Sequence, residues 1–215
     1  MSPRPTMIRV RKAQIRTAAA ELIGERGLAA TRIEDVAARA GTSKAAVLYW
    51  FKDKDALLTE ALALQDEVFY AELTQRLASM ESAGARLRLV CETFLSSYDY
   101  RLWMEICLRS LRDSGTAEAR SAQDVRWRAM IAQTILEGQE RGEFESGDAD
   151  ELSLSLAALL DGLSMQIAMA DPVVSRERAT RVWLAAATSW LGTAADLDAA
   201  GAENAPAAVA APLHP

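Results

Sequence analysis

Basic side chains recur in the first turns of three expected helices, at Arg32, Lys44 and Lys54. A helix N-terminus already carries about half a positive charge, so a cation there is disfavoured unless an anion compensates it. Free amides at a helix start with a lysine nearby form a phosphate site, and three such sites could hold one nucleic-acid duplex in register. The alternative is that acids in the same turns, such as Glu34 and Asp35, offset the helix dipoles unaided.

The charge of the chain is unevenly distributed. Residues 1–53 hold ten Lys and Arg against five Asp and Glu, a net charge of +5, whereas the whole chain carries −6. The other 162 residues therefore carry −11. This split predicts a small segment that meets a polyanion and a larger acidic segment that does not.

The groups that most enzymes use are missing from the sequence. The only histidine, His214, is the second-last residue, so a Ser-His-Asp triad or a His-based zinc site has no imidazole on a packed scaffold. Neither phosphate-binding glycine motif, GxGxxG or GxxxxGK[ST], occurs. Cys91 and Cys107 lie in apolar stretches and are interpreted as buried thiols, with a redox pair as the alternative. We predict no enzymatic activity, no metal and no cofactor.

A helical period recurs along almost the whole chain and no segment shows a sustained two-residue alternation, which predicts an all-α fold. The expected helices cover residues 8–26, 32–40, 43–50, 54–80, 85–100, 101–113, 117–141, 148–170 and 175–197. The second and third are short and meet at a turn containing Gly41, which is typical of a helix-turn-helix. The prediction is an N-terminal three-helix helix-turn-helix domain followed by a larger helical domain.

Helix-capping residues support these boundaries. Thr31 and Glu34 have the spacing of a capping box, in which each side chain satisfies the backbone amide of the other. Thr42 or Ser43 would cap the next helix, and Asp53 the one after it.

We expect three segments: a helix-turn-helix domain over 1–53, a larger helical segment over 54–197, and a disordered tail over 198–215. The tail holds eight alanines and three prolines in 18 residues and has no helical period. The longest stretch without a charge, 182–195, is 14 residues, too short for a membrane span. The basic N-terminus lacks the apolar run of a signal peptide, so a cytoplasmic location is expected.

The stretch QIRTAAAELIGERGLAATRIEDVAARAGTSKAAVLYWFKDKDALL, residues 14–58, closely resembles the DNA-binding domain of the tetracycline-repressor (TetR) family of transcriptional regulators. The matching positions have fixed spacings and are the Ala-Ala and Leu-Ile core of the first helix, Gly27, Thr31, Ile33, Val36, Ala37, Ala40, Gly41, Ser43, Lys44, residues 48–51 and Lys54.

The resemblance implies that Thr31 and the start of the second helix touch phosphate, that residues 43–49 enter the major groove, and that Lys54 clamps the backbone. The expected DNA-contact residues are Thr31, Thr42, Ser43, Lys44, Ala45, Ala46, Tyr49, Trp50 and Lys54. For Trp50 a structural role under the fourth helix is the alternative.

The sequence departs from the commonest family pattern at three places. Ala46 stands where a threonine is frequent, Leu48 where a first tyrosine is frequent, and Trp50 where a histidine is frequent. Base readout by hydrogen bonds is therefore reduced, and contact of Ala45 or Ala46 with thymine methyl groups is favoured.

In the family that the resemblance implies, the larger segment holds an effector pocket and the dimer interface. The helix expected over 148–170 is apolar on every side, which predicts that it is buried on every side. With the last helix it would form a four-helix dimer interface, or both would be core helices of a monomer. The expected interface residues are Leu156, Leu163, Trp183, Ala187 and Trp190.

An acid among leucines, Asp161, stands out in this segment, because an unpaired charge there is costly. It is either paired internally or, with Glu105, forms the anionic wall of an aromatic-lined pocket for a cationic effector. The other expected pocket residues are Phe94, Trp103, Trp127, Met130, Ile131 and Met165. Residues 103–191 more weakly resemble the C-terminal domain of the choline-responsive BetI-type branch, a resemblance that does not transfer the ligand.

These observations predict a homodimer that binds double-stranded DNA at a palindromic operator and leaves it when a small molecule enters the larger domain. A repressor and an activator are not distinguished by the sequence. Two other classes stay open: a DNA-binding protein without small-molecule control, and an enzyme that uses Asp161 and Glu105 as a carboxylate pair.

Overall fold

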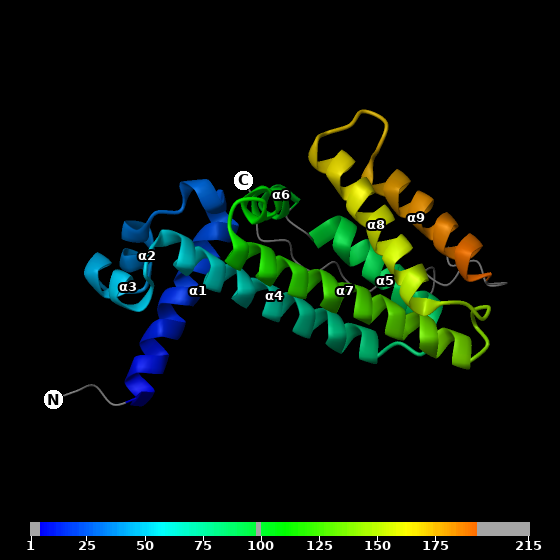
Figure 1. Ribbon diagram of the computed structural model, residues 1–215, viewed down its shortest axis with the longest axis horizontal. Helices are drawn as coiled ribbons and strands as arrows, with labels where there is room; N and C mark the ends of the chain where they lie inside the picture. Colours follow the sequence, from blue (N-terminus) through cyan, green and yellow to red (C-terminus); the bar gives the residue numbers. More distant parts are fainter. Residues whose placement is uncertain (1–4, 98–99, 193–215) are drawn as a thin grey trace. The chain divides into compact units, whose positions relative to one another are not determined.

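The computed structural model describes residues 5–97 and 100–192, and within them every regular element is helical, which confirms the all-α prediction (Figure 1). The helices are α1 Pro5–Ala30, α2 Ile33–Arg39, α3 Lys44–Trp50, α4 Lys54–Ala78, α5 Ala83–Ser97, α6 Tyr100–Ser110, α7 Ser114–Glu140, α8 Ala149–Ala168 and α9 Arg176–Leu191. None of these described helices is long and apolar enough to cross a membrane.

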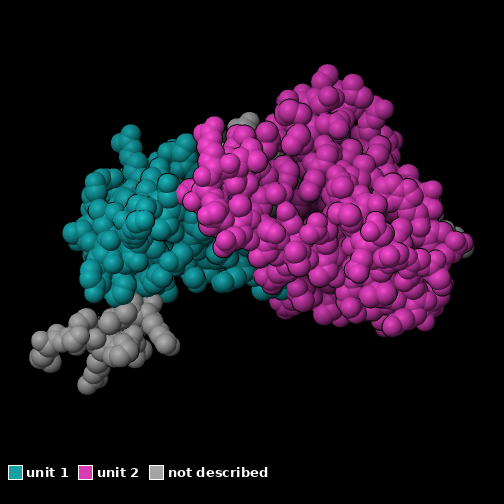
Figure 2. All heavy atoms as spheres, in the orientation of Figure 1, with its two compact units in different colours: residues 1–72, 212–215 teal, residues 73–211 magenta. Residues whose placement is uncertain are grey.

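The described residues form two compact units, coloured separately in Figure 2: unit 1, residues 5–72, and unit 2, residues 73–97 and 100–192. The division between the two units falls inside α4. The boundary predicted from the sequence lies before α4, between residues 53 and 54. The tail expected over 198–215 lies outside the described residues.

Unit 1 is built on the apolar stripe of α1 that the helical period predicts, and all five residues of that stripe are buried: Ile15, Ala18, Ala19, Leu22 and Ile23. At Gly27 the backbone leaves the helical conformation, with φ 78° and ψ 168°, which is the region that glycine adopts at little cost. The sequence therefore places the interruption of the first helix correctly.

Ion pairs hold α2 against α1 in unit 1. The Arg39 guanidinium donates to the Glu25 carboxylate at 2.8 and 2.9 Å and to Glu21 at 3.3 Å. These bonds lower the pKa of Glu25 below its usual value. Arg26 adds a pair with Asp35 at 3.4 Å. Several cations of the basic segment are thus neutralised by the helices beside them.

Unit 2 is arranged around α7, which packs against α5, α6 and α8, while α8 and α9 form an antiparallel pair (Figure 1). The Trp183 indole on α9 is fully buried, and its Nε1 donates to the Leu156 carbonyl on α8 at 2.9 Å. This bond satisfies the one polar atom of the largest buried side chain in the unit.

The turn that follows α7 closes against the start of α5. The Glu143 carboxylate accepts hydrogen bonds from the amides of Ala83 at 2.7 Å and Gly84 at 3.3 Å, and so caps α5 from a distant part of the chain. Behind it the Phe144 ring is buried against the backbone of Gly138, where a Cβ atom would overlap the ring and lie 3.0 Å from the Cβ of Ala83.

We expect Gly138→Ala to lower the free energy of unfolding by about 1–3 kcal/mol, because the new methyl group displaces a buried ring. Urea denaturation followed by circular dichroism measures this value. Gly115→Ala is the matched control, since its Cβ would meet only Asp113 Oδ2 at 3.7 Å. Equal stability of the two variants would contradict the close packing of Phe144.

Candidate nucleic-acid interface and effector site

The seven-residue helix α3 is fixed by its buried side and its cap. Val47, and Phe51 directly after the helix, are buried, whereas Ser43 Oγ accepts a hydrogen bond from the Ala46 amide at 3.1 Å. The caps predicted at Ser43 and Asp53 are both confirmed, the second by a bond from the Ala56 amide to Asp53 Oδ1 at 2.8 Å. The face opposite Val47 is left to solvent.

That exposed face carries most of the residues expected to meet DNA. Ser43, Lys44 and Ala45 are exposed, and the Tyr49 side chain is 79% exposed. Thr42, Ala46 and Trp50 are half-buried. The ring of Trp50 meets that of Tyr49 edge to face, with 5.0 Å between the centroids, and so supports it.

The structure places Thr31 differently from the expectation. The capping box does not form: Arg32 is the N-cap of α2 and makes no side-chain cap, while the Thr31 hydroxyl donates to the Gly27 carbonyl at 2.8 Å. Thr31 is only 1% exposed, so its side chain is not available to a phosphate. A threonine hydroxyl at the end of a helix commonly donates to the carbonyl four residues earlier, and here this bond takes the place of the expected cap.

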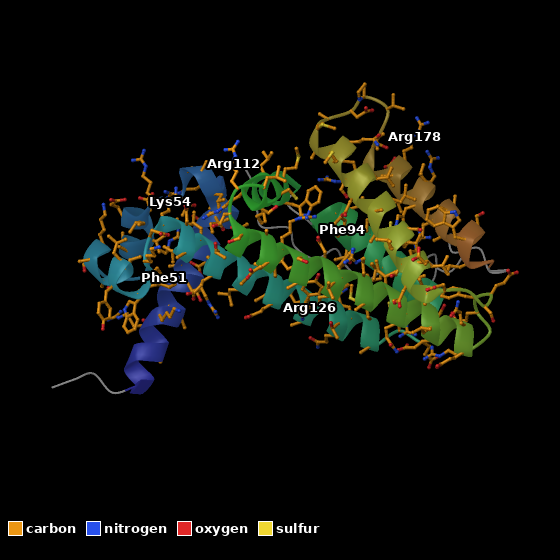
Figure 3. The ribbon with its side chains drawn as sticks, viewed as in Figure 1. Phe51, Lys54, Phe94, Arg112, Arg126 and Arg178 are labelled. Carbon is orange, nitrogen blue, oxygen red and sulfur yellow. The ribbon has the colours of Figure 1, made fainter. Side chains whose placement is uncertain are left out.

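The three cations at helix starts differ in their partners. Lys44 Nζ lies 2.6 Å from Glu34 Oε1, and this bond lowers the pKa of Glu34. Lys54 Nζ donates to the Ala29 carbonyl at 3.4 Å, and its position at the start of α4 is labelled in Figure 3. Among residues 10–72, Arg32, Lys52 and Lys54 form no ion pair with an acid. Lys52 was missed by the sequence reasoning, which counted it only in the net charge.

In unit 2, Asp161 on α8 is half-buried and, within the described part of the chain, accepts no hydrogen bond and forms no ion pair. Burial, together with the nearby Asp124 carboxylate, raises the pKa of Asp161 to about 6, against the opposing effect of Arg120 and Arg128. The internal pairing that the sequence left open is therefore not made in the described residues.

Arg120, one of the two cations that oppose this shift, has other partners. Arg120 pairs with Asp124 at 3.2 Å and lies over the half-buried Trp103 ring, 5.9 Å from its centroid. It also bonds the Cys107 thiol, which is half-buried and not fully buried as expected. Asp124 was missed by the sequence reasoning, because an acid four residues after an arginine is typical of a plain surface pair.

The other expected pocket residues separate into three groups. Phe94 on α5 (Figure 3) and Trp127 on α7 are buried with their ring centroids 4.9 Å apart, and Ile131 is fully buried. Met130 is half-buried, whereas Met165 is 41% exposed and belongs to the outer face of α8. The side chain of Glu105 lies outside the described residues.

The expected dimer interface needs correction. Leu156, Leu163, Trp183 and Ala187 are buried within one chain, where they join α8 to α9 and the helices beside them, and Trp190 alone of the five is exposed. Within one chain α8 is not buried on every side. Its exposed apolar or small residues follow one stripe: Leu154, Ala158, Gly162, Met165 and Met169.

Two family models match the chain. The one described as bacterial regulatory proteins of the tetR family covers residues 15–61, and the one described as BetI-type transcriptional repressor, C-terminal, covers residues 83–192. The second match alone spans more than half of the 215 residues. The chain belongs to the TetR family of transcriptional regulators.

Individual relatives agree with this assignment. The HTH-type transcriptional regulator BetI of Burkholderia thailandensis is 30% identical over 175 residues, which is 78% of this chain and 87% of that protein. A solved transcriptional regulator from Saccharomonospora viridis, in complex with choline, is 29% identical with a TM-score of 0.70, over 80% of this chain and 92% of that one. A TetR-family regulator from Rhodococcus is 26% identical with a TM-score of 0.68, over 84% and 98%.

This TetR-family protein therefore carries its helix-turn-helix in α2 and α3, as the sequence resemblance implied. The matched range 15–61 contains all the residues that are expected to contact DNA, from Thr31 to Lys54. Its BetI-type range contains Asp161, Arg120 and Asp124.

We expect Asp161→Asn to raise the free energy of unfolding by on the order of 2 kcal/mol at pH 8, because the folded chain no longer holds a desolvated charge. The pKa of Asp161 is raised by folding from 3.8 to about 6, so the folded state binds its proton more tightly and the carboxylate destabilises the fold above pH 6. The difference in the free energy of unfolding between the variant and the parent should become smaller as the pH falls from 6 towards 4.

Urea denaturation of both proteins at pH 4, 6 and 8 measures this difference. Glu118→Gln, which removes an exposed acid from the same unit, is the control and should show no such trend. A loss of stability in Asp161→Asn at pH 8 would mean that the carboxylate has a stabilising partner.

Proposed function

We propose that this regulator binds an inverted-repeat operator as a homodimer through α3 and leaves it when a cationic small molecule binds beside Asp161. The observation that carries the effector class is the half-buried Asp161 carboxylate without a partner among the described residues. An uncompensated buried charge destabilises the fold, so a ligand of opposite charge is the simplest reason for its presence.

The proposed DNA contacts follow from exposure and free charge. Lys44, Ala45 and Tyr49 enter the major groove from α3, with Thr42, Ser43, Ala46 and Trp50 at its margins. Arg32, Lys52 and Lys54 bind phosphates, because none of them forms an ion pair with an acid of the described unit. Lys44 joins them only by exchanging Glu34 for a phosphate, an exchange between solvent-exposed partners that costs little.

The proposed effector site lies among α6, α7 and α8. Asp161 and Asp124 supply negative charge, and Trp103 supplies the aromatic face that attracts a cation. The Arg120 guanidinium lies over that ring and would have to give way to the effector. The choline complex of the Saccharomonospora regulator supports a quaternary ammonium compound as the first class to test.

Release from DNA is a population shift. A dimer reads two half-sites about one helical turn, ~34 Å, apart, so an effector that prefers another spacing of the two α3 helices lowers operator affinity. The ligand can shift this equilibrium only by its difference in affinity for the two states.

Fluorescence anisotropy of an operator duplex, obtained by selection from random DNA, tests the effector class. Choline should displace the protein, and 3,3-dimethyl-1-butanol, its neutral isostere, should not. Asp161→Asn should keep operator affinity and lose the response to choline by about tenfold or more, because a desolvated charge pair is removed. Equal effects of choline and its isostere, or release by neither, would contradict a cationic effector.

The dimer proposal rests on the exposed stripe of α8, where Ala158 and Gly162 allow close approach of a second helix and Met165 supplies apolar contact. On α9, Val182 and Trp190 are exposed large apolar residues that can complete the interface. A two-fold symmetric dimer is what a palindromic operator requires.

We expect Met165→Asp to convert the dimer to monomers in sedimentation velocity and to weaken operator binding by about tenfold or more, since a charge would be buried without a partner. Leu111→Asp is the control: Leu111 is 81% exposed and lies outside the stripe. A variant with Met165→Asp that still sediments as a dimer would rule out this face.

A further inference from the structure

The exposed face of α3 is apolar at its centre. Ala45, Leu48 and Tyr49 share one side of the helix, because residues three and four apart are neighbours there. Leu48 is 39% exposed, and Val47 beside it in sequence is fully buried on the opposite side. A single exposed leucine is ordinary on a protein surface, but this one lies in the middle of the face that the proposed function places on DNA.

The hydrogen-bonding groups of this face lie at its ends. Ser43 Oγ accepts from the Ala46 amide at 3.1 Å, and Lys44 Nζ is bonded to Glu34 at 2.6 Å. The Tyr49 hydroxyl is at the other end, on a ring held against Trp50. Side chains at 45 and 48 can offer a base edge nothing but apolar contact.

In the major groove the apolar group that distinguishes one base pair from another is the C5-methyl group of thymine. We infer that Leu48, with Ala45 beside it, contacts a thymine methyl group in each half-site and so determines specificity at that position. The inference rests on the proposed binding of α3 in the major groove. Leu48 stands where the family pattern often has a tyrosine, and this apolar contact would replace the hydrogen bond that the tyrosine could make.

Replacing thymine by uracil removes this methyl group and leaves base pairing intact. With the full-length protein and the selected operator duplex, each thymine is replaced in turn and affinity is measured by anisotropy. We expect symmetric uracil substitutions at one position of the half-sites to weaken binding about fourfold per methyl group. In Leu48→Ala the same substitution should change affinity less than about twofold, because the partner of the methyl group is gone.

Two controls separate the possible outcomes. Leu111→Ala, in unit 2, should keep the full uracil effect, and Leu48→Ala should keep the helical circular dichroism of the parent, since Leu48 is 39% exposed and not part of the buried core. A specific operator that is insensitive to uracil at every position overturns this inference alone. The same holds if Leu48→Ala retains the uracil effect. A selection that enriches no sequence overturns the proposed function and this inference with it.

Discussion

The orientation of α3 depends on the burial of Val47 within the helix and Phe51 directly after it. A helix of seven residues is not stable by itself in water, so packing and the Ser43 cap determine where it points. Because these two side chains face inward, Ala45, Leu48 and Tyr49 must face outward. The proposed DNA-binding surface is thus a consequence of the core of unit 1.

Charge is arranged in both units so that some groups are left without a partner. In unit 1, acids of α1 and α2 form ion pairs with Arg26 and Arg39, while Arg32 and Lys52 form none among residues 10–72. In unit 2, Arg120 is engaged by Asp124 and leaves Asp161 uncompensated. Each uncompensated group has the sign that suits its proposed ligand, a phosphate in unit 1 and a cation in unit 2.

The sequence was sufficient for the helices, the caps at Ser43 and Asp53 and the family, because these depend on local spacing. It failed for Thr31, because the hydroxyl bonds the carbonyl four residues earlier and does not cap the next helix. It could not tell which side of α8 is left exposed within one chain, because α8 is apolar on every side and only its packing against α7 and α9 shows this. The role of Asp124 likewise depends on α8 lying beside α7.

We propose above all that the basic face of unit 1 binds one specific DNA duplex as part of a dimer. The most direct test is selection of random DNA by the full-length protein, followed by affinity and stoichiometry at increasing salt. The account predicts an inverted repeat with half-sites about one turn apart, two chains per duplex, and a log-log salt slope that grows by about 0.9 for each phosphate contact. One chain per duplex, with equal affinity for all sequences, would contradict it.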